Sequence, residues 1–166
     1  MQHLNQFQSF AKRSKQQTIR NNKAVIYTRV SDIKQRDNTS LESQLKYCSE
    51  YADKNGMEIS SYFGGTNESA KTDDRKEFQR MLSYVKKKKI ANIIVYSTDR
   101  FSRAGESAIH TLAEIRRIGI NLIAVTQPAD TQTSTGRFYQ NLNLLFSKYD
   151  NDLRRDKTIT GMRHRL

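Results

Sequence analysis

Residues 23–30 read KAVIYTRV, a short segment of mainly β-branched and apolar residues that decides the fold class. A run of this length with consecutive apolar side chains is typical of a strand buried on both faces of a sheet. Similar runs occur at residues 57–63, at 92–96 (NIIVY) and at 120–126 (INLIAVT). We therefore expect a sheet of four to five strands with its faces covered by the segments between them.

Segments with helical spacing lie between these strands. The first is expected to begin at Thr39, which offers an N-cap with Glu42 three residues on, and to end at Gly56. Its expected buried stripe is Leu41, Leu45, Cys48 and Ala52. A second helix has apolar positions at Phe78, Met81, Leu82 and Val85 and ends in the lysines 86–89, and a third spans 107–118. Alternating strands and helices predict an α/β domain with a mainly parallel sheet and an active site at the carboxyl ends of its strands.

The charge of the chain indicates a polyanionic partner. Lys and Arg number 29 against 17 Asp and Glu, which gives a formal charge of +12 over 166 residues. A positive field of this size attracts nucleic acid by releasing counterions from it. An excess of basic residues can also serve solubility alone, so the identity of the partner depends on the residues of the site and not on the net charge.

The remaining composition limits the compartment and the cofactors. One cysteine, Cys48, excludes an intramolecular disulfide and a Cys-rich zinc site, and its helical position predicts a small buried side chain. No apolar run approaches the length of a membrane span, and the N-terminus lacks the apolar core of a signal peptide. We expect a soluble, cytoplasmic protein with no membrane partner.

Three parts of the chain differ in pattern. Residues 1–22 are polar and basic and predict a solvated arm, residues 23–134 form the α/β domain, and residues 135–166 predict one long helix. An apolar stripe follows this helix at spacings of three or four residues: Phe138, Leu142, Leu145, Phe146, Tyr149 and Leu153. So long a stripe packs either on its own domain or on a partner chain, and we expect an oligomer interface.

The residues that could take part in catalysis follow the ends of two strands. Arg29 and Ser31 alternate to the same side where the first strand leaves the sheet, while Asp99, Arg100 and Arg103 follow the third strand. Separately, a serine there is a loop residue or cap, and the arginines are surface charges. Together, guanidinium groups around one hydroxyl fit a phosphate, because their paired donors match phosphoryl oxygens.

Three strings in this order resemble the resolvase, invertase and large serine recombinase superfamily: YTRVSDIKQ at 27–35, DDRKEFQRML at 73–82 and STDRFSR at 97–103. The resemblance runs from about residue 23 to the C-terminus and implies a three-layer resolvase-like fold. It also implies that Ser31 is the nucleophile. The residues that it places around the scissile phosphate are Arg29, Arg75, Arg100 and Arg103, with Gln35, Gln44 and Asp99 in support.

The resemblance further implies a reaction. Ser31 attacks a phosphodiester of double-stranded DNA, leaving a 5′-phosphoserine and a 3′-hydroxyl, and the ends are exchanged and rejoined within a tetramer built from dimers. The expected reaction uses no metal and no cofactor, since the arginines supply the positive charge that a metal supplies elsewhere. No histidine accompanies Ser31 in these strings, which disfavours a Ser-His-Asp mechanism.

The C-terminal helix resembles the connecting helix of the same superfamily but departs from it in detail. Where the superfamily has Glu-Arg pairs, this sequence has Asp150-Asn151 and Asp156-Lys157, which puts a phosphate contact from position 151 in doubt. The residues expected to touch DNA are Arg154, Arg155, Lys157 and Arg163. We expect the parent protein to continue into a separate DNA-binding region.

Three alternatives remain open. Ser31 to Lys34 fits the S-x-x-K pattern of serine acylases, although no K-T-G or S-D-N companion occurs. A metal-dependent nuclease or a nucleotide-binding domain could use the aspartates Asp32, Asp37, Asp73, Asp74 and Asp99, although no P-loop or G-x-G-x-x-G follows a strand. The third alternative keeps the fold as a non-catalytic DNA-binding or assembly module.

Overall fold

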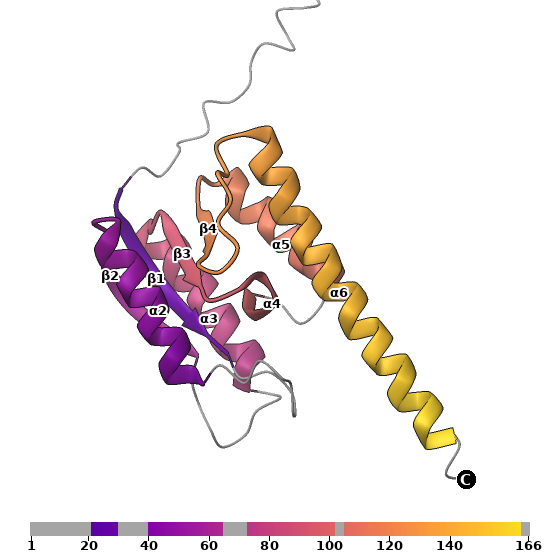
Figure 1. The fold of residues 1–166 in the computed structure, drawn as a ribbon. Helices are drawn as coiled ribbons and strands as arrows, with labels where there is room; N and C mark the ends of the chain where they lie inside the picture. Colours follow the sequence, from indigo (N-terminus) through magenta and orange to yellow (C-terminus); the bar gives the residue numbers. More distant parts are fainter. Residues whose placement is uncertain (1–20, 30–39, 65–72, 102–104, 164–166) are drawn as a thin grey trace, which may run out of the picture.

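The computed structural model describes residues 21–29, 40–64, 73–101 and 105–163 (Figure 1). In chain order the elements are β1 (Lys23–Thr28), α2 (Leu41–Lys54), β2 (Glu58–Gly64), α3 (Asp73–Lys88), β3 (Asn92–Val95), α4 (Thr98–Phe101), α5 (Gly105–Arg117), β4 (Asn121–Ala124) and α6 (Ser134–Arg163). The described strands form one parallel sheet in the order β2-β1-β3-β4. This arrangement confirms the expected α/β class, the mainly parallel sheet and the long C-terminal helix.

Helices cover both faces of the sheet. Along β1, Val25 and Tyr27 point into a core shared with α3 and α5, and Ala24 and Ile26 point into a second core shared with α2. In Figure 1, α2 lies on one side of the sheet and α3 and α5 lie on the other. The alternation of buried side chains along a central strand thus produces three layers, because each face needs its own cover.

The buried face of α2 differs from the expected stripe. Cys48 and Ala52 are fully buried, as expected, and burial raises the pKa of the Cys48 thiol to about 12. Leu45 is instead 38% exposed, and the buried position in the preceding turn is Gln44, at 1%. The prediction for Leu45 is wrong because Gln44 is buried through its hydrogen bonds to the end of β1.

The N-cap of α2 is also one residue later than expected. Ser40 has non-helical backbone angles, and its side chain accepts a hydrogen bond from the backbone N–H of Ser43 at 3.1 Å. Thr39 is therefore not the cap, because only the residue directly before the first helical one reaches the free N–H groups of the first turn. Thr39 itself lies outside the described residues.

The first half of α6 is fixed to the domain by polar and apolar contacts. Leu144 and Gln140 are each 2% exposed. The Gln140 amide donates to the carbonyl of Leu122 in β4 at 2.8 Å, and Arg116 of α5 donates to Gln140 Oε1 and to Asn141 Oδ1 at 2.6 and 3.0 Å. Burial, with a smaller contribution from the positive charge of Arg137, lowers the pKa of Arg116.

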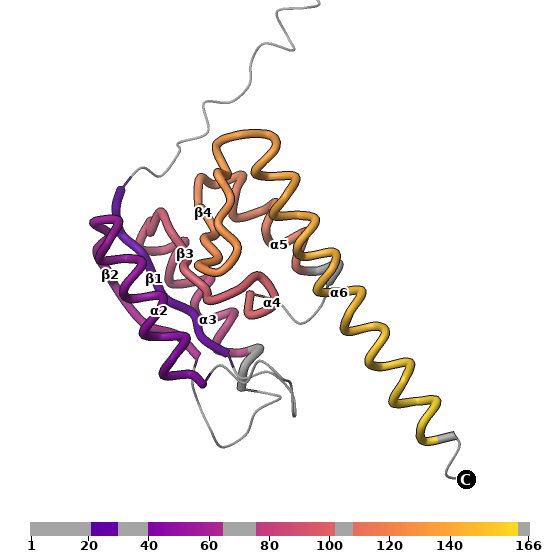
Figure 2. Tube along the Cα trace, in the orientation of Figure 1, coloured from indigo at the N-terminus to yellow at the C-terminus, as the bar shows by residue number. Residues whose placement is uncertain are grey.

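The second half of α6 projects beyond the domain (Figure 2). Every described side chain from residue 150 to residue 162 is exposed. Most of the expected stripe is exposed as well: Phe138 66%, Leu145 48%, Phe146 58%, Tyr149 60% and Leu153 38%. The stripe therefore does not pack on its own domain. Despite the length of α6, none of the described helices has the apolar stretch needed to cross a membrane.

Candidate active site

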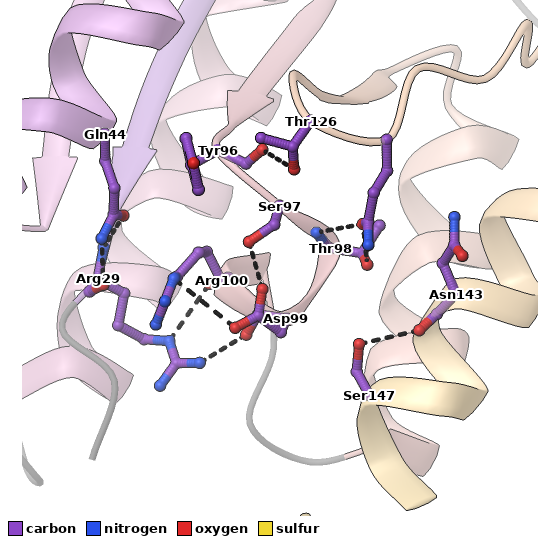
Figure 3. A network of polar contacts seen from close by, with 11 residues as sticks. Arg29, Gln44, Tyr96, Ser97, Thr98, Asp99, Arg100, Thr126, Asn143 and Ser147 are labelled. Carbon is purple, nitrogen blue, oxygen red and sulfur yellow. Dashed lines mark hydrogen bonds and ion pairs between the residues drawn. The ribbon is translucent and has the colours of Figure 1, made fainter. Parts of the chain in front are cut away.

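The carboxyl ends of β1 and β3 bring two of the sequence strings together. Tyr27 of β1 pairs with Val95 of β3 in parallel register, so the residues that follow each strand leave the sheet side by side. Arg29 follows β1, and α4 with Asp99 and Arg100 follows β3 after a two-residue bend. The structure thus places Arg29, Asp99 and Arg100 at one edge of the sheet (Figure 3).

Arg29 is held at both its backbone and its side chain. Its backbone N–H donates to Gln44 Oε1 at 3.3 Å, and the Gln44 amide donates back to the Arg29 carbonyl at 3.1 Å. Its guanidinium donates to the carbonyls of Arg100 and Asp99, at 3.3 and 2.5 Å. The segment that enters residues 30–39 is therefore fixed to α2 and to α4.

Arg100 is a buried cation with unused donors. Arg100 is only 4% exposed. Its Nε atom lies 3.7 Å from Asp99 Oδ2, which is close enough for an ion pair but too long for a hydrogen bond. Among the groups that the structure describes, neither Nε nor Nη1 of Arg100 has a hydrogen-bond partner. A buried unpaired donor costs about 1–3 kcal/mol, and more when it is charged, so this arrangement favours binding of an anion.

Two residues that sequence reasoning missed hold α4 in place. Gln127 Oε1 accepts hydrogen bonds from both the backbone N–H and the hydroxyl of Thr98, at 3.0 and 2.6 Å. The hydroxyl of Ser97 donates to Asp99 Oδ1. Gln127 lies just after β4, at the same sheet edge, so the rule that strand ends converge could have found it.

A glycine allows β2 to approach the end of β1. Gly64 has a φ of +88°, and a Cβ atom at this position would lie 1.8 Å from the carbonyl oxygen of Thr28. No other residue fits here without moving the backbone directly before Arg29. Gly64 therefore sets how closely the two strand ends pack beneath the site.

The remaining expected site residues are only partly covered by the structure. Ser31, Gln35 and Arg103 lie outside the described residues. Arg75 is in the first turn of α3, and its side chain is not described. Of the aspartates considered for a metal site, Asp99 has a described side chain, and in the described part of the chain no three His, Cys, Asp or Glu residues are close enough to hold a metal ion.

The residues expected to contact DNA lie far along α6. Arg154, Arg155 and Lys157 are exposed on its projecting half, and Arg163 is the last residue of the helix. Leu144, where α6 is buried against the domain, precedes all four of these residues along the helix. The basic residues expected to act on DNA therefore fall into two separate groups, one at the sheet edge and one on the projecting helix.

Comparisons with known proteins place this geometry in context. Residues 24–166 match the family described as Resolvase, N terminal domain. The chain is 24% identical over 90 residues to the transposon Tn917 resolvase of Enterococcus faecalis, covering 54% of this chain and 48% of that protein. It is also 24% identical over 94 residues to the DNA-invertase hin of Salmonella typhimurium, covering 57% and 48%. The matches thus span about half the length of these relatives.

Two solved structures have a similar fold. The N-terminal catalytic domain of TP901-1 integrase is 23% identical, with a TM-score of 0.61, and the match covers 80% of this chain and 98% of that one. A resolvase family site-specific recombinase from Streptococcus pneumoniae is 26% identical, also with a TM-score of 0.61, and the match covers 86% and 97%. The sheet and its covering helices are therefore an architecture already seen in recombinase domains.

Proposed function

Because this chain belongs to the resolvase family of the serine recombinase superfamily, we propose that it is the catalytic domain of a site-specific DNA recombinase. The observation that carries the proposal is Arg100, a buried guanidinium at the sheet edge where β1 ends, whose Nε and Nη1 atoms have no hydrogen-bond partner among the described groups. A phosphodiester oxygen is the partner that satisfies such donors best.

In the proposed step, the Ser31 hydroxyl oxygen attacks a phosphorus atom of double-stranded DNA. A bond forms between Ser31 Oγ and phosphorus, the bond from phosphorus to the 3′ oxygen breaks, the serine gives up its proton, and the 3′ oxygen leaves as a hydroxyl. The 5′-phosphoserine ester retains the energy of the broken bond, so the reverse attack by a 3′-hydroxyl rejoins the strand.

The surrounding residues have distinct proposed roles. Arg100 and Arg29, with Arg75 and Arg103, stabilise the negative charge that develops on the phosphoryl oxygens. Asp99 orients Arg100 through its ion pair, and Gln44 fixes the backbone of Arg29 two residues before the nucleophile. Gln35 supports the same segment. The contacts of Gln44 favour a positioning role, because both of its amide atoms are used on the Arg29 backbone.

The partners proposed are DNA and further copies of the chain. The exposed apolar stripe of α6 provides the surface for a homodimer, and two dimers form the tetramer in which strands are exchanged. The basic residues Arg154, Arg155, Lys157 and Arg163 contact DNA phosphates beside this interface. In this arrangement α6 connects assembly of the oligomer to the position of the DNA.

The test is to trap the covalent intermediate. The protein that contains this domain is incubated with a supercoiled plasmid carrying candidate sites and then denatured, and protein attached to DNA 5′ ends is measured. We expect an adduct from the wild type and from Ser83→Ala, an exposed serine of α3 that serves as the matched control, and none from Ser31→Ala. An adduct that persists in Ser31→Ala contradicts the proposed nucleophile. No adduct from any variant would favour the non-catalytic assembly module.

A further inference from the structure

The edge of the sheet opposite the candidate site carries a further concentration of positive charge. Here α2, α3 and α5 end and β1 begins, at the upper edge of the domain in Figure 1. We name this surface the amino edge, and its exposed basic residues are Lys23, Lys54, Lys86, Lys87, Lys88, Lys89 and Arg117. Exposed carboxylates on the same edge include those of Asp53 and Glu58, and Asp130 lies nearby, next to Thr131, whose hydroxyl donates to Asn121 at the start of β4.

Two asparagines join the segments of this edge. The side chain of Asn21 donates to the carbonyl of Lys89 at 2.9 Å and accepts from the backbone N–H of Lys23 at 3.0 Å. The side chain of Asn22 donates to the carbonyl of Gly56, in the turn after α2, at 3.0 Å. The start of β1 and the ends of α2 and α3 are thus joined at this edge, and the lysines lie on these adjoining segments.

Stabilisation of the helix ends does not account for the lysine run. A cation in the last turn of a helix offsets the helix dipole, but the effect falls off within that turn and one or two charges provide it. The run places four like charges at consecutive positions, and their mutual repulsion offsets part of that benefit. Residues 82–85, which precede members of the run by three or four positions, contain no acidic residue, and within the described part of the chain none of the four lysines forms an ion pair.

We infer that the amino edge is a second contact surface for the phosphate backbone of duplex DNA, separate from the catalytic edge. Lysines 86–88 are consecutive in the helix, so they leave it about 100° apart. Charges spread in this way fit a row of phosphates better than one small anion. The surface reads no base sequence, because exposed lysines contact phosphate oxygens as point charges.

The sequence upstream continues the same charge. The chain enters the described fold at Asn21, on the amino edge, and residues 1–20 contain Lys12, Arg13, Lys15 and Arg20 but no Asp or Glu. A DNA segment bound at the amino edge lies at the opposite end of the strands from the DNA strand that is cut. The protein therefore holds one stretch of duplex at the amino edge while the candidate site acts on another.

The test measures binding without cleavage. In a Ser31→Ala background, fluorescence anisotropy follows the binding of a labelled 30-base-pair duplex of arbitrary sequence over a range of salt concentrations. The test variant is Lys87→Gln/Lys88→Gln, and the control is Lys46→Gln/Arg80→Gln, which removes the same charge from exposed positions in the middle of α2 and α3.

We expect the amino-edge variant to bind about tenfold or more weakly at low salt and to lower the slope of log K against log salt by about 2, since each phosphate contact contributes about 0.9. The control should change both quantities much less. An equal loss in both variants would mean that only net charge matters, and unchanged binding with a lowered Tm would mean that the lysines serve the helix alone; either result overturns the inference. Because no cleavage is measured, this outcome is independent of the phosphoserine test.

Discussion

The two halves of α6 share one continuous helix but differ in what holds them. In the first half, Leu144 and Gln140 are buried against β4, α4 and α5, and Arg116 adds two hydrogen bonds. In the second half, residues 150–162 are all exposed, and the side-chain hydrogen bond described there, from the Thr158 hydroxyl to the Arg154 carbonyl at 2.9 Å, stays within the helix. The first half is thus part of the domain, and the second depends on helix propensity or on a partner for its stability.

The largest effect expected is on association, because the exposed stripe has no other partner in the described structure. Leu145→Asp/Phe146→Asp should convert an oligomer into a monomer in sedimentation, since two charges would have to be buried at the interface. The unfolding of the isolated monomer should change little, because both side chains are about half exposed. An unchanged sedimentation coefficient would rule out the stripe as the interface. The control Lys157→Ser, farther along the helix, should leave sedimentation unchanged.

Adjacent leucines provide the sharpest test of which face is buried. Leu144 is 2% exposed and Leu145 is 48% exposed. Leu144→Ala should lower the free energy of unfolding by about 2–5 kcal/mol, through lost burial and the cavity that remains. Leu145→Ala should change it by about 0.5 kcal/mol or less in the monomer. Equal losses in chemical denaturation would show that α6 does not dock on the face described here.

The next effect concerns the polar connection between α5 and α6. Arg116→Met keeps much of the side-chain volume but removes the two hydrogen bonds to Gln140 and Asn141. It leaves the buried Gln140 oxygen without this donor, and we expect a loss of about 1–3 kcal/mol in the free energy of unfolding. The matched control is Arg117→Met, an exposed neighbour at the end of the same helix. A variant as stable as this control would show that the connection contributes nothing.

Sequence reasoning predicted the strands well because buried parallel strands are encoded locally. The apolar runs at 23–30 and 92–96 correspond to β1 and β3, and the rule that parallel strand ends converge brought Arg29 and Arg100 together. Helix faces were predicted less well. A pattern of apolar spacing places Leu45 inside and gives no reason to bury Gln44, yet Gln44 is buried by hydrogen bonds to a backbone segment that is distant in sequence.

The same cause explains what sequence reasoning missed on α6 and at α4. The apolar stripe on α6 is the more regular pattern and stays exposed, while the domain buries the face with Gln140 and Leu144, which apolar spacing does not single out. Gln127 was missed because its partner, Thr98, is 29 positions away and no local pattern links them. Apolar periodicity reports which residues avoid water, whereas the choice between a neighbouring helix and another chain depends on contacts that form only in the folded protein.

The smallest effect expected comes from the two glycines of α6, and its sign separates the two halves. A Cβ atom on Gly161 would have no heavy atom within 4 Å, whereas one on Gly136 would lie 1.9 Å from the carbonyl oxygen of Asp130. Gly161→Ala should stabilise the projecting half by about 0.5–1 kcal/mol, because alanine loses less backbone entropy in a helix. This gain should appear as slower amide exchange around residues 155–162 with no change in the Tm of the domain.

Gly136→Ala should instead lower the Tm, since the loop before α6 would have to move. If both substitutions shifted the Tm in the same direction, the two halves would be one cooperative unit and the contrast between them would fail.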